Sequence, residues 1–225
     1  MNTYEANFWN LFGNSLAENT MDNNVIQMWS SRDYNLSRFY TTGFETILFN
    51  KEQLFVLETV LASTVAWDNE ILIAGNCNSL EKLCKAVNKQ NLTHYCLDWS
   101  SDSWGDIEND FHTYSGVTHL LVGIDSLTSP EKIPVNKLLL LTAKYKLTLI
   151  VYCDISVTGL NDIFNGAIDY MIGRSSVEPP KSFLVARRNK LVQTEGKSRS
   201  FKMDLYTYWQ WSMRDWTSII EPMRI

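Results

Sequence analysis

The sequence predicts an α/β fold: a three-layer sandwich in which helices cover a mostly parallel central sheet. Short apolar segments that end in turn residues recur along the chain, and segments with apolar residues at helical spacing separate them. The longest apolar segments lack polar alternation, which is typical of parallel strands buried on both faces. Because such sheets bind ligands at the carboxyl ends of their strands, candidate functional residues are expected there.

Each predicted element rests on a local pattern. Residues 51–64 are expected to form a helix because Leu54, Leu57 and Leu61 recur at helical spacing. Residues 70–76 form an apolar segment that closes in turn residues, which indicates a strand followed by a helix. Further strands are expected at residues 94–97, 118–124, 147–153, 167–173 and 182–186, and further helices at 107–113 and 135–145.

Residues 1–44 differ in composition from the rest of the chain. They are rich in Asn and Ser with scattered aromatic side chains, too polar for a core and too aromatic for a free tail. We expect them to form an N-terminal arm. Residues 45–225 are expected to form one domain, because no repeat, low-complexity tract or linker interrupts them.

The chain shows no targeting or membrane signal. Residues 1–13 lack a basic stretch followed by an apolar one, which argues against a secretory signal. The longest apolar segment, residues 138–152, is interrupted by Lys144 and Lys146 and is too short to span a bilayer. We therefore expect a cytoplasmic protein without a membrane partner.

Composition and charge exclude few functions. The 225 residues are 45% hydrophobic, as in an ordinary folded protein. Lys and Arg total 20 against 25 for Asp and Glu, so the net charge is −5. A chain of this charge has no general attraction to phosphate backbones, and we expect no nucleic-acid partner.

Common site motifs are missing. Cys77, Cys84, Cys96 and Cys153 lack C-x-x-C spacing and lie in mostly apolar segments, so they are predicted to be reduced core thiols. The three histidines are not spaced as a metal pair on a helix, and no metal site is expected. The usual glycine-rich phosphate loops and the G-x-S-x-G nucleophile turn are also missing from the sequence.

The second half of the chain resembles a known family. The segments KLTLIVYCD, GAIDYMI, SFLVARR and EGKSRSFKMDLYTYW follow one another in the order of consecutive blocks of the class V aminotransferases, above all its phosphonate transaminase branch. The resemblance covers about residues 45–218, and the last of these blocks, residues 195–209, is its most specific part.

The resemblance implies a large domain that binds pyridoxal 5′-phosphate (PLP) between the subunits of a homodimer. The chemistry requires a Schiff-base lysine, but the family's lysine aligns with Gly173 or Val177, and no lysine occurs between Lys146 and Lys181. The family also requires an aspartate at the pyridinium nitrogen. That position aligns with Tyr152, and Asp154 lies two residues further on the same strand face.

The expected phosphate loop is also altered. It aligns with residues 51–58, where Lys51 and Gln53 replace glycines and Glu52 places a carboxylate at the expected anion site. A second turn of the family keeps one acid and one hydroxyl, Asp125 and Thr128. The small C-terminal domain of the family is expected to be absent.

These changes predict a degenerate aminotransferase-like domain with no catalytic residues and no cofactor. Aromatic side chains near both ends of the chain suggest a non-catalytic scaffold that binds a protein partner or forms a homodimer. The alternative is that these side chains only cover the sheet surface that the missing small domain leaves bare. One alternative is a transaminase that works with a partner chain or binds PLP non-covalently, with Lys51 or Lys181 near the strand ends. Another is a small-molecule sensor. If PLP binds at all, Asp154, Asp125 and Thr128 are the expected binding residues.

Overall fold

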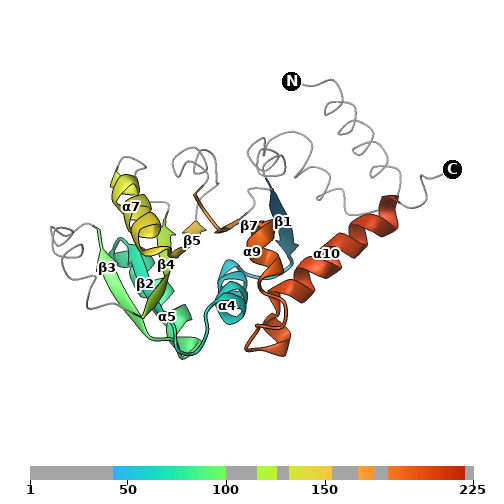
Figure 1. Ribbon diagram of the computed structural model, residues 1–225, viewed down its shortest axis with the longest axis horizontal. Coiled ribbons are helices and arrows are strands. Elements are labelled where there is room, and N and C mark those ends of the chain that lie inside the picture. The colour runs from blue at the N-terminus through green and yellow to red at the C-terminus, as the bar shows by residue number, and fades with distance from the viewer. Residues whose placement is uncertain (1–42, 100–115, 126–131, 154–166, 175–181, 221–225) are drawn as a thin grey trace, which may run out of the picture.

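The computed structural model describes residues 43–99, 116–125, 132–153, 167–174 and 182–220. Within these ranges the chain folds around one mixed sheet, with helices on both faces (Figure 1). The predicted arm and the predicted helix at 107–113 lie outside the described residues, apart from the last two positions of the arm.

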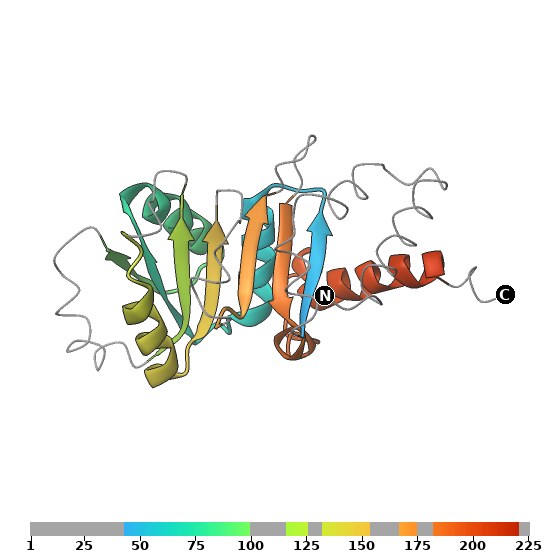
Figure 2. The same ribbon diagram turned by 90° about the horizontal axis from the view of Figure 1, so that it is seen from above.

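The described part of the chain contributes seven strands to the sheet, in the order β1-β7-β6-β5-β4-β2-β3 (Figure 2). β7 pairs antiparallel with both of its neighbours, whereas the pairs from β6 to β3 are parallel. The mostly parallel sheet predicted from the sequence is therefore confirmed, with one reversed strand. The strands are β1 (Phe44–Phe49), β2 (Glu70–Gly75), β3 (His94–Asp98), β4 (Val117–Ile124), β5 (Thr148–Cys153), β6 (Tyr170–Arg174) and β7 (Ser182–Arg187).

The helices cover the sheet in two layers, so the predicted three-layer sandwich is also confirmed. α4, α5, α9 and α10 lie on one face, and α7 lies on the other (Figures 1 and 2). The far end of α10 extends past β1, away from the sheet (Figure 2). The helices are α4 (Gln53–Thr64), α5 (Cys77–Lys89), α7 (Val135–Tyr145), α9 (Arg188–Val192) and α10 (Leu205–Ile220), with a short 3-10 helix, η3, at Phe201–Met203.

Burial on both faces explains the unbroken apolar strands. In β5, Ile150 and Tyr152 pack toward the helices α4 and α5, whereas Val151 and Cys153 pack toward α7. Side chains alternate between the two faces of a strand, so a strand covered on both sides needs apolar residues at every position.

The sequence prediction missed four elements: β1, α9, η3 and α10. β1 contains the buried polar residues Glu45 and Thr46, which break the apolar pattern. Arg188 forms an ion pair with Glu45, which makes this buried carboxylate tolerable. α9 and α10 were not predicted either, because α9 is only five residues long and α10 is rich in aromatic residues. The short η3 also escaped prediction.

The prediction of core thiols is wrong for three of the four cysteines. Only Cys153 is buried; Cys77 and Cys96 are exposed and Cys84 is half-buried. Cys77 begins α5 at the edge of the molecule, and Cys96 lies on the edge strand β3, which has a neighbour on one side only.

None of the helices in the described ranges is long and apolar enough to cross a membrane.

Candidate functional site

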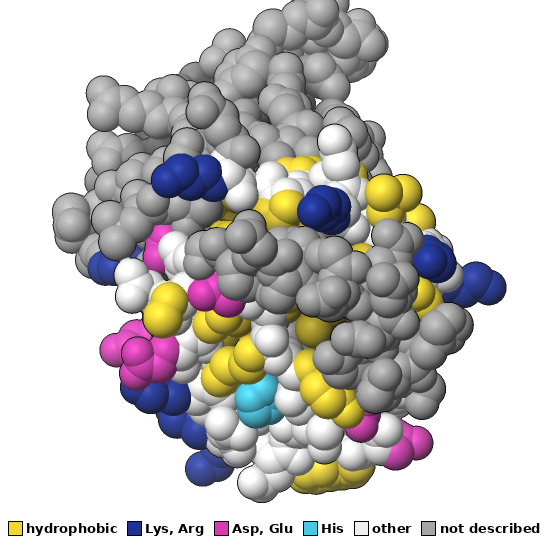
Figure 3. Space-filling view, turned by 90° about the vertical axis from the view of Figure 1, so that its left-hand side faces the viewer, with side chains coloured by type: hydrophobic (Ala, Val, Ile, Leu, Met, Phe, Trp, Pro, Cys, Tyr) yellow, Lys and Arg dark blue, Asp and Glu magenta, His cyan; other side chains and the backbone are white. Residues whose placement is uncertain are grey.

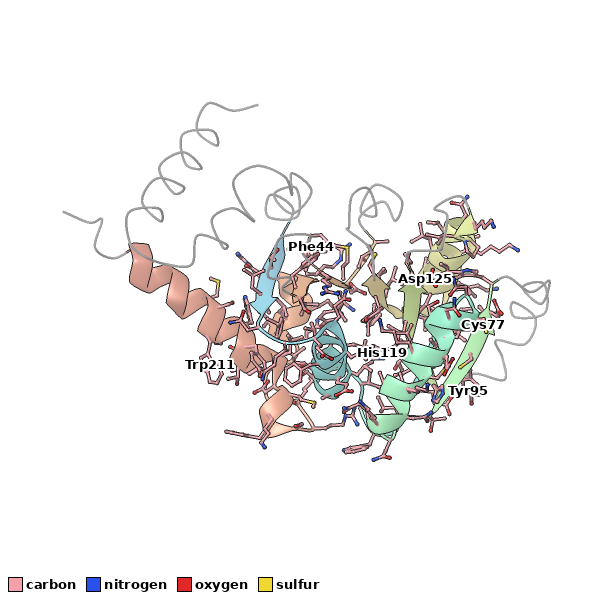
Figure 4. All side chains as sticks on the ribbon, turned by 180° about the vertical axis from the view of Figure 1, so that it is seen from behind. Phe44, Cys77, Tyr95, His119, Asp125 and Trp211 are labelled. Carbon is pink, nitrogen blue, oxygen red and sulfur yellow. The ribbon has the colours of Figure 1, made fainter. Side chains whose placement is uncertain are left out.

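The carboxyl ends of β2, β4 and β5 meet at one edge of the sheet, here called the carboxyl edge, next to the first turns of α4 and α5. Asp125 follows β4 directly, and Asn76 follows β2. The Asn76 Nδ2 atom donates a hydrogen bond of 2.9 Å to Asp125 Oδ2. Figure 4 shows Asp125 on the side of the sheet where Cys77 begins α5.

Asn76 also caps α5. Its Oδ1 atom accepts hydrogen bonds from the Ser79 backbone N–H at 3.0 Å and from Ser79 Oγ at 2.7 Å. The same amide therefore satisfies a free N–H group of the helix and orients the Asp125 carboxylate. Capping of α5 is a sufficient structural reason for Asn76, and the same side chain holds Asp125 at the carboxyl edge.

Glycines let α5 lie close to the strands. A Cβ atom added to Gly75 would lie 2.6 Å from Ser79 Oγ, and one added to Gly123 would lie 2.6 Å from Leu83 Cδ1. Close packing at these two strand positions fixes the first turn of α5 over the carboxyl edge.

Gln53 fills the space between α4 and β5. Its side chain is buried, and Nε2 donates a hydrogen bond of 2.7 Å to the carbonyl oxygen of Cys153. Glu52 occupies the cap position of α4 in an extended conformation, but its side chain makes no capping hydrogen bond. The expectation that Glu52 replaces a bound anion therefore has no support in its contacts, and Gln53 is the residue that ties α4 to this edge.

Lys82 and Tyr152 form the second polar contact of the carboxyl edge. Tyr152 lies on β5 with only 2% of its surface exposed. Lys82, in the second turn of α5, places Nζ 5.0 Å from the centre of the Tyr152 ring. Sequence reasoning missed Lys82, although it lies one helical turn after Ser79 and therefore on the same side of α5.

The other residues selected from the sequence do not join this group. Asp154, Thr128 and Lys181 lie outside the described residues. Lys51 is exposed, and its Nζ atom lies 6.0 Å from the ring centre of Phe55 on α4. Of the expected cofactor-binding residues, the structure describes Asp125 alone.

Two contacts of the described residues differ from those that the resemblance implies for bound PLP. A protonated pyridine nitrogen needs a carboxylate, but Tyr152 occupies the aligned position and the cationic Lys82 lies over it. A phosphate group needs free N–H groups and space at a helix start, and the buried Gln53 side chain occupies this region of α4.

The block with the most specific resemblance lies at the opposite edge of the sheet. Arg199 donates hydrogen bonds from its guanidinium to the carbonyl oxygens of Leu61 at 3.2 Å and Gln90 at 3.1 Å, at the ends of α4 and α5. Partial burial lowers the pKa of Arg199. Cations are favourable at helix C-termini, so this block is structural in the described fold.

The opposite edge also holds a buried histidine. His119 is 5% exposed, and its Nδ1 atom lies 2.7 Å from Thr118 Oγ1. Burial, together with the charge of Lys190, lowers the pKa of His119 to about 4. His119 is therefore neutral at pH 7 and packs as a core residue. An open hollow between β1 and α9, lined by Gly43, Arg187, Arg188 and Gln193, lies at this edge too, away from Asp125 and Lys82.

Two of the cysteines lie together at the β3 end of the sheet. Cys84 Sγ lies 2.7 Å from Cys96 Sγ, and a ring nitrogen of His94 lies within 4.8 Å of both. Burial, with the neighbouring Cys96 thiol, raises the pKa of Cys84 to about 12. No metal-ligand spacing is visible in the sequence here, because the three residues come from two different elements.

Sequence comparisons find aminotransferases. No known family model matches the chain. The chain is 22% identical over 196 residues to a 2-aminoethylphosphonate–pyruvate transaminase of Bacillus cytotoxicus, covering 84% of this chain and 54% of that protein. It is 24% identical over 176 residues to the transaminase of the same name in Salmonella paratyphi B, covering 75% and 48%. The chain therefore spans about half the length of these relatives.

Comparison with solved structures also finds a PLP-dependent enzyme. A serine palmitoyltransferase of S. paucimobilis, solved with a bound PLP–myriocin aldimine, matches with a TM-score of 0.55 at 16% identity, covering 85% of this chain and 52% of that one. Similarity at this level of identity concerns the fold. The chain therefore has the α/β fold of PLP-dependent transferases, and its sequence is similar to those of the two transaminases.

Proposed function

We propose that this chain is a non-catalytic, aminotransferase-like domain that acts by binding a protein partner or a second copy of itself. The observation that carries the proposal is the Lys82–Tyr152 contact at the carboxyl edge. The sequence supports it, because no lysine lies between Lys146 and Lys181, where the family's covalent anchor aligns.

Charge explains why this contact opposes PLP chemistry. In the family, a carboxylate keeps the pyridine nitrogen protonated so that the ring can accept electrons. An ammonium group beside the same position repels a protonated ring and favours the neutral one. A neutral ring is a poorer electron sink, so catalysis would be lost even if the cofactor entered the site.

The proposal is tested by adding PLP to the purified full chain. We expect no saturable visible absorbance band and no rise in melting temperature, whereas a catalytically active transaminase treated in parallel gives both. A saturable band accompanied by thermal stabilisation would contradict the proposal.

Lys82 itself favours a second candidate function, a PLP-binding protein anchored at a different lysine. Among the described residues, Lys82 is a lysine that contacts the end of β5. The alternative drawn from the sequence placed Lys51 or Lys181 near this strand end. In this candidate, Asp125 is a cofactor-binding residue, and Asp154 and Thr128, which lie outside the described residues, are further cofactor-binding residues.

Borohydride trapping separates the two candidates. If Lys82 anchors PLP, peptide mapping after reduction finds the adduct on Lys82, and Lys82→Met abolishes it. Lys85→Met is the matched control, because Lys85 is an exposed lysine of the same helix that pairs with Glu81. Trapping that is absent, or equal in both variants, excludes this second function.

A further inference from the structure

We propose that Cys84, His94 and Cys96 bind a zinc ion at the outer end of the sheet, independently of the carboxyl edge. Their ligand atoms, two thiol sulfurs and one imidazole nitrogen, all lie within 4.8 Å of one another. Sulfur with imidazole is the ligand set that Zn²⁺ prefers in proteins, and the three donors can share one ion once the two sulfur atoms, 2.7 Å apart, separate to the roughly 3.8 Å of a tetrahedral site.

Two elements bring the three residues together. His94 and Cys96 lie two positions apart on β3, so their side chains leave the same face of the strand. α5 covers that face and supplies Cys84, whose Sγ atom lies 2.7 Å from that of Cys96. Figure 4 labels Tyr95, which lies between the two β3 ligands in sequence, on the strand next to α5.

A backbone hydrogen bond prepares His94 for metal binding. Its Nδ1 atom lies 3.3 Å from the carbonyl oxygen of Leu92. A carbonyl oxygen can only accept, so Nδ1 carries the proton and Nε2 keeps the lone pair that a metal needs. Metal-binding histidines commonly make this kind of outer contact, which fixes the tautomer and the ring orientation.

The cluster is accessible from solvent. Cys96 is exposed, and Cys84 and His94 are half-buried, so an ion can enter without opening the core. Figure 3 views the molecule from the end formed by β3 and α7, where hydrophobic and charged side chains both reach the surface. Binding one Zn²⁺ releases the protons of the two thiols, and water completes the coordination left open by the three described ligands.

A bound ion would join α5 to the edge strand. β3 pairs with β2 alone in the described sheet, so its outer side has no strand to hold it. A metal ion that bridges β3 and α5 would therefore limit fraying of this edge strand. Zinc should then raise the melting temperature of the full chain.

The test uses the reduced, chelator-treated full chain titrated with Co²⁺ and then Zn²⁺. We expect one Co²⁺ per chain, with a sulfur-to-cobalt charge-transfer band that Zn²⁺ abolishes by displacement. Zinc should also protect Cys84 and Cys96, but not Cys77, from alkylation mapped by mass spectrometry. This last readout needs no variant and so does not depend on variants that fold.

Single substitutions identify the ligands. Cys84→Ser, Cys96→Ser and His94→Gln should each weaken Co²⁺ binding by at least about tenfold, and each cysteine change should reduce the charge-transfer band. Cys77→Ser is the matched control, because Cys77 is an exposed thiol of α5 outside the cluster. The proposal is overturned by Co²⁺ binding without a charge-transfer band or by equal alkylation with and without zinc. It is also overturned if Cys84 and Cys96 form a disulfide that the reductant does not break.

Discussion

Arg199 performs a structural task within the segment that most resembles the aminotransferases. Its guanidinium reaches the last carbonyl groups of two helices, and its backbone N–H donates a 2.9 Å hydrogen bond to the carbonyl oxygen of Ala62. The same guanidinium lies 4.4 Å from the centre of the Trp67 ring. This arginine therefore stabilises the ends of α4 and α5, and it lies away from the carboxyl edge where a catalytic site is expected.

Replacing Arg199 should lower stability. Arg199→Ala removes two charge-assisted hydrogen bonds and should cost about 2–3 kcal/mol in the free energy of unfolding, measured with urea. Arg199→Lys should recover only part of this loss, because one ammonium cannot reproduce the planar fork that reaches both carbonyls. Arg174→Ala, at an exposed arginine, is the control and should be neutral. Equal stabilities for all variants would refute the structural role.

His119 should make the fold sensitive to acid. Its pKa is about 4 in the folded chain and 6.5 in the unfolded chain, so between these values the unfolded chain binds more protons. Stability should therefore be complete above pH 6.5 and fall as the pH drops toward 4, by up to roughly 3 kcal/mol. Urea unfolding at several pH values measures this loss.

One variant assigns the effect to His119. His119→Gln should reduce the slope of stability against pH between pH 6.5 and 4, relative to the wild-type chain. If the variant retains the wild-type slope, another group causes the acid sensitivity.

At the scale of elements, the packing of α5 depends on two glycines in the strands beneath it. Gly75 and Gly123 allow the first turns of the helix to approach β2 and β4, which places Asn76 beside Asp125. The position of the candidate site therefore follows from close packing between a helix and two strands.

Gly75→Ala should destabilise the fold, and the size of the loss should depend on the side chain at position 79. The new Cβ would lie 2.6 Å from Ser79 Oγ, so we expect a loss of about 1–3 kcal/mol. In a Ser79→Ala background the nearest remaining side-chain atom is 3.4 Å away, and the same substitution should cost less. A double-mutant cycle measures this coupling, and strictly additive free energies would show that the clash is not the cause.

Local patterns predicted most elements within a few residues. The helix at Val135–Tyr145 agrees with the predicted range, and the strand predicted at 147–153 begins one residue later, at Thr148. α10 escaped prediction because its first turns are aromatic. Tyr208 packs on Phe49 with ring centres 5.1 Å apart, and Trp209 is buried, so these aromatics cover β1 and α4.

At the scale of the whole molecule, α10 presents an exposed apolar surface, within the described residues, that suits a partner. Trp211 is 56% exposed and Met213 is 40% exposed, beyond the part of the helix that packs on the domain. Exposed aromatic and Met side chains are enriched at protein interfaces. The proposed scaffold function therefore predicts self-association or partner binding through this end of the helix.

Light scattering over a range of concentrations checks the prediction. The mass of the wild-type chain should rise toward that of a dimer, and Trp211→Ser should remain closer to a monomer. Leu140→Ser is the control, because Leu140 is 69% exposed on α7, across the sheet from α10. A wild-type chain that remains monomeric throughout would exclude self-association.

The sequence by itself determined the α/β class, the positions of six of the seven described strands and the resemblance to class V aminotransferases, because apolar periodicity and motif spacing are local properties. It also identified Asp125, which directly follows a strand. Only the tertiary structure placed Lys82 over Tyr152 and Cys84 beside His94 and Cys96. These contacts join α5 to β5 and to β3, and they arise from how the helix packs on the sheet, which the spacing of residues within one element does not encode.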